Sequence, residues 1–290
     1  MGSTNLPQSL PDSLINGLDV RSAEPLSGGD IALAYRLETP DGPLFLKTKE
    51  QPTPDLFERE AAGLTILRAH APAELGVPEV IRSDSSGLVL QWIPQGRPKR
   101  DTEAELGRGL AALHRTTHET FGAIDTALAG YLGSAQVDLT PTKTWREFLV
   151  EHRIRPLTRR AVDEGALDPQ ALELVDRLAA KADELCGPPE PPALVHGDLW
   201  AGNRVVDTDG RSWLIDPAAH WAHREYDLAM MNLFGGFGDE CFAAYDEAFP
   251  LADGWRERIP WNQLPPLLVQ AILFGGGYGG AALRVMRSYL

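Results

Sequence analysis

The sequence is short of cysteine and of basic residues, and each shortage excludes a class of protein. Cys186 and Cys241 are the two cysteines of the 290-residue chain, and neither belongs to a C-x-x-C motif or a His/Cys pattern. They support neither a zinc site nor a disulfide framework, so we expect a reduced, cytoplasmic setting. Lysine and arginine number 27 against 41 aspartates and glutamates. Because phosphate backbones and anionic membranes bind basic surfaces, we expect no nucleic-acid or membrane partner.

Long apolar runs are also missing. The first ten residues have neither the basic start nor the apolar core of a signal peptide. The most apolar late segment, residues 264–285, is interrupted by Pro265, Pro266, Gln270 and five glycines between 275 and 280. Such a segment is a poor candidate for a membrane span. The length and the ordinary composition instead predict a globular chain with room for two lobes.

Residues 194–216 carry the strongest signal for chemistry. His196, Asp198 and Asn203 stand at the spacing H-x-D-L-x-x-x-N, which is typical of the catalytic loop of phosphotransferases, and Asp216 ends the following strand. In that chemistry an aspartate accepts the proton of the attacking hydroxyl, while amide and carboxylate oxygens hold the Mg²⁺ that bridges the phosphates of ATP. The pattern predicts Asp198 as the base, Asn203 and Asp216 as metal ligands, and ATP and Mg²⁺ as cofactors.

A β-hairpin is predicted inside this stretch. Expected strands at 204–206 (Arg-Val-Val) and 213–215 (Trp-Leu-Ile) flank an Asp- and Gly-rich turn at 207–210. Folding the hairpin places Asn203 beside Asp216, so that both can reach one cation. A lone H-G-D tripeptide or an Asp-rich turn can be purely structural. The complete set of loop, hairpin and trailing Asp-Pro favours an active site.

Candidate nucleotide-binding residues lie nearer the N-terminus. Gly28 and Gly29 stand between two expected strands, where glycine allows close approach to phosphates, although a turn alone would also explain them. Lys47 ends an apolar strand and could hold the α- and β-phosphates or be a solvated strand end. On the next helix either Glu58 or Glu60 could pair with Lys47. Glu60 is favoured because helical spacing directs it toward the sheet.

The apolar strand at 88–93 is followed by Pro-Gln-Gly at 94–96, a pattern typical of a hinge between lobes. Backbone groups around Gln91, Trp92 and Ile93 are therefore expected to contact the adenine edge. The sequence predicts an α+β, two-lobed, protein-kinase-like fold. Residues 1–93 would form a nucleotide-binding lobe with an antiparallel sheet, and residues 94–290 a larger, mainly helical lobe for catalysis and acceptor binding.

Three features of the second lobe have open interpretations. Residues 101–117 predict a helix that starts with a capping box at Thr102, and its His114 and His118 stand four apart but lack a third ligand for a metal. Arginines between 145 and 160 could attract an anionic substrate or, as we favour, pair with nearby acids. Asp227 could cap a helix or brace the catalytic loop.

Residues 169–185 predict one further amphipathic helix in the second lobe. Apolar residues recur there at close to helical spacing, which predicts a stripe that faces the core. The residues of this stripe are Leu172, Val175, Leu178 and Leu185.

Four motifs together resemble the fructosamine kinase (ketosamine 3-kinase) family, within the aminoglycoside phosphotransferase and choline kinase-like group. They are H-G-D-L-W-A-G-N at 196–203, I-D-P-A at 215–218, H-R-E-Y-D-L-A-M at 223–230 and L-F-G-G-F at 233–237. The similarity runs over nearly the whole chain. The tryptophan at 200 and the H-R-E-x-D-L-A-M run resemble this family in particular.

The resemblance implies ATP-dependent phosphorylation of the sugar 3-hydroxyl of small-molecule or protein-bound ketosamines. The 3-phosphate makes the adduct unstable, so the amine is regenerated in a deglycation reaction. By position, Asp198 would be the base, Asn203 and Asp216 would hold Mg²⁺, and Lys47 with Glu60 would orient the phosphates. Trp200 would offer a flat face to the sugar, unless it only packs between the lobes.

Two departures from the family pattern leave questions open. Asp30 replaces a cysteine that many members use for redox-controlled dimerisation, so this control is not expected; a monomer is compatible with the sequence. His220 and Trp221 replace an aromatic pair, which leaves the acceptor open.

A related phosphotransferase for aminoglycosides, choline or a homoserine-like acceptor is the main alternative. A nucleotide-binding pseudokinase is less well supported, because the residues needed for catalysis are present.

Overall fold

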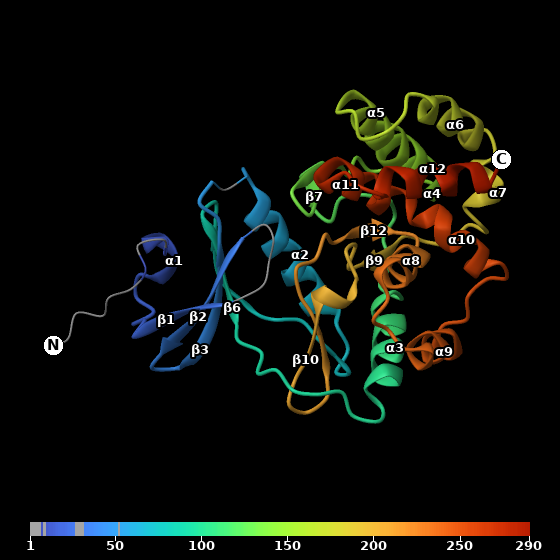
Figure 1. Ribbon diagram of the computed structural model, residues 1–290. Helices are drawn as coiled ribbons and strands as arrows, with labels where there is room; N and C mark the ends of the chain where they lie inside the picture. The colour runs from blue at the N-terminus through green and yellow to red at the C-terminus, as the bar shows by residue number, and fades with distance from the viewer. Residues whose placement is uncertain (1–6, 8–9, 27–31, 52) are drawn as a thin grey trace.

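The computed structural model describes residue 7 and residues 10–26, 32–51 and 53–290. A sheet built from the first third of the chain lies beside a larger, mainly helical part (Figure 1). The predicted α+β class, with an antiparallel sheet followed by helices, is therefore confirmed. In the part of the chain that is described, no helix combines the length and apolar character needed to cross a membrane.

The N-terminal sheet has five antiparallel strands in the order β1-β2-β3-β6-β5. Its elements and flanking helices are α1 Asp12–Ile15, β1 Ser22–Leu26, β2 Leu33–Thr39, β3 Gly42–Thr48, α2 Leu56–His70, β5 Val80–Asp84 and β6 Gly87–Gln91. Helix α1 packs on one face with Leu46, and α2 packs on the other face with Leu90. Because side chains alternate along a strand, Lys47 points to the α2 side.

Helices dominate the chain after residue 91, with three small sheets among them. The helices are α3 Thr102–Leu113, α4 Trp145–Glu147, the π-helix η1 Phe148–Ile154, α5 Arg155–Asp163, α6 Gln170–Ala179, α7 Ala182–Leu185, the short η2 Ala201–Asn203, α8 Glu225–Phe234, α9 Asp239–Ala248, α10 Trp255–Asn262, α11 Leu264–Phe274 and α12 Tyr278–Ser288. The strands of these sheets are β7 Ala129–Leu132, β8 Ala135–Asp138, β9 Ala193–Val195, β10 Arg204–Val206, β11 Ser212–Leu214 and β12 His220–Ala222. Strand β4 Leu75–Gly76 precedes residue 91 but belongs to one of these sheets.

The predicted hairpin forms from β10 and β11, which pair antiparallel with Arg204 opposite Leu214. Strand β11 also pairs in parallel with β4, which follows α2 in the chain. Side chains from α2, α3, β9 and β11 share one buried core. Because this core continues across residue 93, the lobe boundary placed there stays a prediction.

The linker after the sheet is bonded to the tip of the β10–β11 hairpin. The Gly96 N–H donates to the Val206 carbonyl (2.8 Å), and the Thr102 hydroxyl donates to the Gly210 carbonyl (2.7 Å). The predicted capping box is wrong, since Asp101 occupies the N-cap and makes no side-chain cap bond. Thr102 instead accepts the Lys99 N–H and connects the linker to the hairpin.

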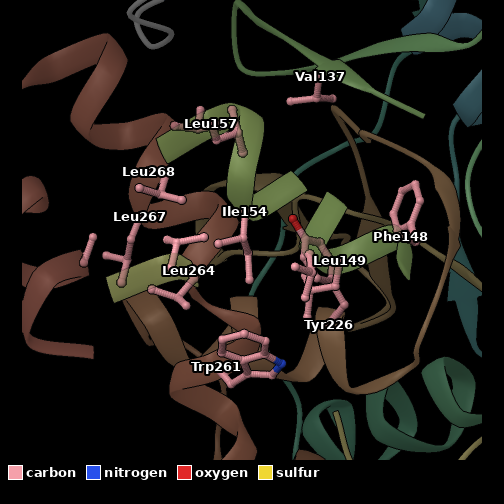
Figure 2. Close-up of a cluster of buried hydrophobic side chains, with 14 of the residues drawn as sticks. Val137, Phe148, Leu149, Ile154, Leu157, Tyr226, Trp261, Leu264, Leu267 and Leu268 are labelled. Atoms are coloured by element: carbon pink, nitrogen blue, oxygen red, sulfur yellow. The ribbon is translucent and has the colours of Figure 1, made fainter. Parts of the chain in front are cut away.

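A second core lies among the helices of the C-terminal part, as Figure 2 shows for Ile154, Tyr226, Trp261 and Leu264. One continuous helical run, α4–η1–α5, contributes Ile154 to it. The run widens to π spacing just before Pro156, and the Arg155 N–H donates to the carbonyl of Val150. Proline has no N–H to continue regular α-helical bonding, which explains this local change.

The helix predicted over 169–185 is interrupted, and its buried stripe differs from the predicted one. Helices α6 and α7 replace it, Leu172 is 38% exposed and Leu185 is only half-buried. Ala171 is buried in place of Leu172, beside Val175 and Leu178. A small residue at position 171 permits close packing in the core. The spacing of the larger apolar residues therefore predicted burial of Leu172, one position away from the residue that is buried.

Replacing Leu178 by alanine should lower the free energy of unfolding by about 2–5 kcal/mol, because the fully buried side chain leaves a cavity. Leu172→Ala on the same helix should cost less than about 1 kcal/mol. Urea unfolding followed by circular dichroism measures both values. Equal losses for the two variants would contradict the burial described for this helix.

Candidate active site

Lys47 joins the N-terminal sheet to the hairpin of the C-terminal part. Its ammonium group donates to both oxygens of Glu60 (3.0 and 3.2 Å) and to the carboxylate of Asp216 (2.8 Å). The predicted pair with Glu60 therefore forms, and Asp216 is its second partner. Glu58 makes no such pair: one of its carboxylate oxygens is buried without a hydrogen-bond partner among the described residues.

The charges in this cluster shift each other's protonation. Burial would lower the pKa of Lys47, but the two carboxylates outweigh it and raise that pKa. Burial raises the pKa of Glu60 by more than Lys47 lowers it. For Asp216 the balance is reversed, because the charge and hydrogen bond of Lys47 overcome burial and lower its pKa. Asp216 is thus the carboxylate that stays ionised.

The hairpin brings Asn203, Asp198 and Asp216 together, as the sequence predicts. The Asn203 amide nitrogen donates to the backbone carbonyl of Asp198 (2.9 Å), to its carboxylate (3.1 Å) and to the carbonyl of Asp216 (3.3 Å). These bonds use the amide nitrogen of Asn203 and not its oxygen. Burial and the charge of Asp216 raise the pKa of Asp198 to about 7, against the opposing hydrogen bond from Asn203.

Asp227, in the first turn of α8, holds the backbone of the catalytic loop. Its carboxylate accepts the N–H groups of His196 (2.7 Å) and Gly197 (2.8 Å). Of the two roles open for Asp227, bracing the loop is the one found. A ring nitrogen of His114 lies 3.2 Å from the same carboxylate, and the other lies 2.8 Å from the Tyr245 hydroxyl.

These contacts also decide whether His114 could be a metal ligand. The spacing of His114 and His118 left a metal ligand open, but the ring of His114 is committed to Asp227 and Tyr245. His118 stacks on Trp221, with ring centroids 4.9 Å apart. Sequence reasoning missed that His114 supports the catalytic loop through Asp227, because its partners lie more than 100 positions away and leave no local pattern.

The loop backbone requires glycine at 197. Gly197 has φ 82°, and a Cβ there would overlap the carbonyl oxygen of Ala218. Protein kinases have arginine at this position of the motif (H-R-D), and the contact with Ala218 leaves no room for a side chain here. Asp216 also has a left-handed backbone, with φ 51°. A non-glycine residue in this region costs about 1–3 kcal/mol, which the surrounding bonds must offset.

The remaining predicted site residues are placed as follows. Gly28 and Gly29 lie outside the described residues. The Gln91 N–H donates to the Glu79 carbonyl (2.9 Å), the guanidinium of Arg36 lies 5.1 Å from the Trp92 ring centroid, and Ile93 is buried. Contact of this segment with adenine stays a prediction.

Trp200 lies in the catalytic loop and is 40% exposed. Its ring lies over Gly202 and meets the ring of Phe234 edge-on, with centroids 5.9 Å apart. Both partners belong to the C-terminal part, and the exposed face is free for a ligand. Its contact with a sugar stays a prediction. His220 and Trp221, in contrast, are buried, so neither presents a surface to an acceptor in this conformation.

Comparisons with known proteins agree with this geometry. The sequence model of a family described as fructosamine kinase matches residues 3–290. A Lactiplantibacillus plantarum protein named probable ketoamine kinase is 33% identical over 276 residues, which cover 93% of this chain and 95% of that protein. The chloroplastic protein-ribulosamine 3-kinase of Arabidopsis thaliana is 30% identical over 277 residues, covering 91% of this chain and 81% of that protein.

Solved structures show the same fold. A Thermobifida fusca protein that carries the provisional name fructosamine-3-kinase has a TM-score of 0.88 at 39% identity, covering 97% of this chain and 99% of its own. An aminoglycoside phosphotransferase, crystallised with AMP-PNP and hygromycin B, has a TM-score of 0.61 at 18% identity, covering 97% and 99%. The second likeness supports the kinase-like fold alone.

Asp227→Asn should lower the free energy of unfolding at pH 7 by about 1–3 kcal/mol, because an amide N–H would face the loop N–H donors. Burial would raise the pKa of Asp227, but hydrogen bonds from His114 and Gly197 hold it below the ordinary value of 3.8. A depressed pKa contributes stability that is complete above the unfolded value and is lost as the pH falls through the folded value.

The difference in stability between the wild type and Asp227→Asn should therefore be constant from about pH 8 to 5 and shrink below about pH 4. Urea unfolding at each pH measures it, with Asp209→Asn in the exposed hairpin turn as the control. A difference that grows on acidification would contradict the bonding of Asp227 described above.

Proposed function

The chain belongs to the fructosamine kinase family, and from this premise we propose that it transfers the γ-phosphoryl group of ATP to the sugar 3-hydroxyl of a fructosamine. The family and the relatives make the protein a ketosamine kinase, that is, a phosphotransferase that acts on an alcohol group. The particular sugar, the 3-position and a role in deglycation are the parts we propose. The observation that most supports this proposal is that Lys47, Asp198, Asn203 and Asp216 lie together in the structure.

The residues present fit a magnesium ion. Asp216 contributes a carboxylate that stays ionised, and the Asn203 amide oxygen is left over from the bonds of its nitrogen. Hard oxygen donors of this kind suit Mg²⁺, which completes its coordination with phosphate oxygens and water. When bound, Mg²⁺ neutralises charge on the triphosphate of ATP. Asn203 and Asp216 would hold it.

We assign Asp198 as the base that would receive the proton of the acceptor hydroxyl. Asn203 fixes one carboxylate oxygen of Asp198, so the other oxygen can point toward an acceptor. Lys47, oriented by Glu60, would contact the phosphates of the nucleotide. Because proton transfer and phosphate binding are assigned to different residues, loss of one need not abolish the other.

The acceptor is proposed to be a small-molecule or protein-bound ketosamine. Trp200 stands two residues after the base and keeps one ring face exposed, which suits the C–H face of a sugar. A ribulosamine is the acceptor named for the Arabidopsis relative, so the choice between a six-carbon and a five-carbon sugar has to be tested.

An acceptor screen tests the proposal. With ATP and Mg²⁺, 1-deoxy-1-morpholinofructose and deoxyfructosyl-lysine should be phosphorylated, whereas kanamycin and choline should not. A coupled assay of ADP release measures turnover, and phosphorus–proton NMR couplings locate the new ester. Assaying a ribulosamine in parallel shows whether the five-carbon or the six-carbon sugar is preferred. Turnover of choline or kanamycin in place of every ketosamine would overturn the proposal.

Asp198→Asn should lower kcat about 10²- to 10⁴-fold, because the variant has no general base at the acceptor hydroxyl. Binding of ADP should persist, since the nucleotide is assigned to other residues. Asp209→Asn provides a matched change at an exposed position and should leave kcat unchanged. If Asp198→Asn turned over at the wild-type rate, the assignment of Asp198 as the base would be wrong.

A further inference from the structure

Arg153 of η1 is a buried cation with few partners. Its side chain is 1% exposed, and one Nη lies 3.5 Å from the hydroxyl of Tyr226. Its Nε and other Nη have no hydrogen-bond partner among the described residues. Other arginines of the same helical run pair with acids, as favoured from the sequence: Arg155 with Glu151 and Asp176, and Arg160 with Glu164.

An uncompensated buried charge destabilises a fold by several kcal/mol by rough estimate, so packing alone does not account for this arginine. Two aromatic rings connect it to His220 of β12. The Phe148 ring lies 5.7 Å from the Arg153 guanidinium carbon and 5.8 Å from the His220 ring, centroid to centroid. The Tyr226 ring lies 5.4 Å from the His220 ring. Arg153 and His220 therefore belong to one buried cluster and share Phe148 and Tyr226 as neighbours.

The hydrogen bond of His220 fixes its tautomer. Nδ1 lies 2.8 Å from the carbonyl oxygen of Ala218, which can only accept, so Nδ1 carries the proton. Burial and the charge of Arg153 lower the pKa of His220 to about 3, which keeps the ring neutral. Nε2 then has a lone pair, and no donor for it is present among the described residues. The Nε and one Nη of Arg153 also lack a partner, so among the described residues Phe148 and Tyr226, not a hydrogen bond, connect Arg153 to the His220 ring.

Ala218 connects His220 to the catalytic loop. The Ala218 N–H donates to the carbonyl of His196 (3.0 Å), and β12 places His220 opposite Val195, the last residue before the loop. The Gly197 backbone is packed against the Ala218 carbonyl, and a Cβ on Gly197 would come 2.9 Å from His220 Nδ1. The carbonyl that His220 holds is thus the one around which the loop turns toward Asp198.

We propose that His220 is a positioning residue for Asp198, which acts by holding the Ala218 carbonyl, and that Arg153 fixes the His220 ring. In this proposal the Nδ1 proton of His220 is required because it forms the hydrogen bond to the Ala218 carbonyl. Arg153 contributes to turnover and does not stabilise the fold. The inference rests on the proposed function only through the turnover assay. A measurement on the loop backbone tests it separately.

Three substitutions of His220 separate its two nitrogens. Asparagine places an N–H near Nδ1, glutamine places its amide near Nε2, and leucine removes both. His220→Asn should keep kcat within about threefold of the wild type, whereas His220→Gln and His220→Leu should lower it about 10- to 100-fold through misplacement of Asp198. The KM for ATP should stay within about twofold in all three, because the nucleotide contacts are elsewhere.

Arg153→Met tests the second residue, and Arg155→Met in the same helical run is its control. Arg153→Met should leave the melting temperature equal or higher, because an unpaired buried charge is removed, and should lower kcat about tenfold. Arg155→Met should leave kcat unchanged. A purely structural arginine would give the opposite result, with a lower melting temperature and unchanged kcat, and would overturn this part.

Amide hydrogen exchange over residues 196–203 gives a readout that needs no acceptor. Exchange should rise in His220→Gln and Arg153→Met and stay at the wild-type level in His220→Asn. If the wild type phosphorylates no ketosamine but the exchange pattern holds, the proposed function fails and the inference stands. If His220→Asn exchanges as fast as His220→Gln, or loses as much kcat, the inference is wrong.

Discussion

The ammonium group of Lys47 lies between the carboxylates of Glu60 and Asp216, and the rest of the site depends on this ion cluster. Asp198 adds a further carboxylate next to Asp216, so negative charge exceeds positive charge in a place where burial penalises both. Burial, and after it the charge of Asp216, raises the pKa values of Glu60 and Asp198. A divalent cation bound with a nucleotide would compensate the carboxylates that the fold has gathered.

Three segments far apart in the chain have to be held together for this cluster to exist. Strand alternation in β3 directs Lys47 to the α2 side, α2 supplies Glu60, and the β10–β11 hairpin delivers Asp216. The pairing of β11 with β4 and the bonds from the linker to the hairpin tip attach this hairpin to segments near the sheet. Asn203 and Asp216 are thus placed by the same contacts that join the two parts.

Much of this could be predicted from the sequence, because the relevant signals are local. The hairpin and the meeting of Asn203 with Asp216 follow from turn residues and strand patterns, and the Lys47–Glu60 pair follows from helical spacing. The errors have tertiary causes. Leu172 is exposed because the core accepts the smaller Ala171.

Other residues have partners far away in the chain, which local patterns do not reveal. Thr102 leaves its predicted cap because a distant carbonyl, that of Gly210, takes its hydroxyl. His114 is bound by Asp227 and Tyr245 from α8 and α9. Arg153 and His220 share Phe148 and Tyr226 as neighbours. No spacing along one element encodes such partners.

The dependence of nucleotide affinity on Mg²⁺ tests the central claim most directly, because it measures the charge compensation itself. Isothermal titration of ADP should give about tenfold or more tighter binding with Mg²⁺ than with EDTA in the wild type, as expected for a metal held by Asp216. In Asp216→Asn this gain should fall below about threefold. A full gain in the variant would show that Asp216 does not hold the metal and would contradict the account.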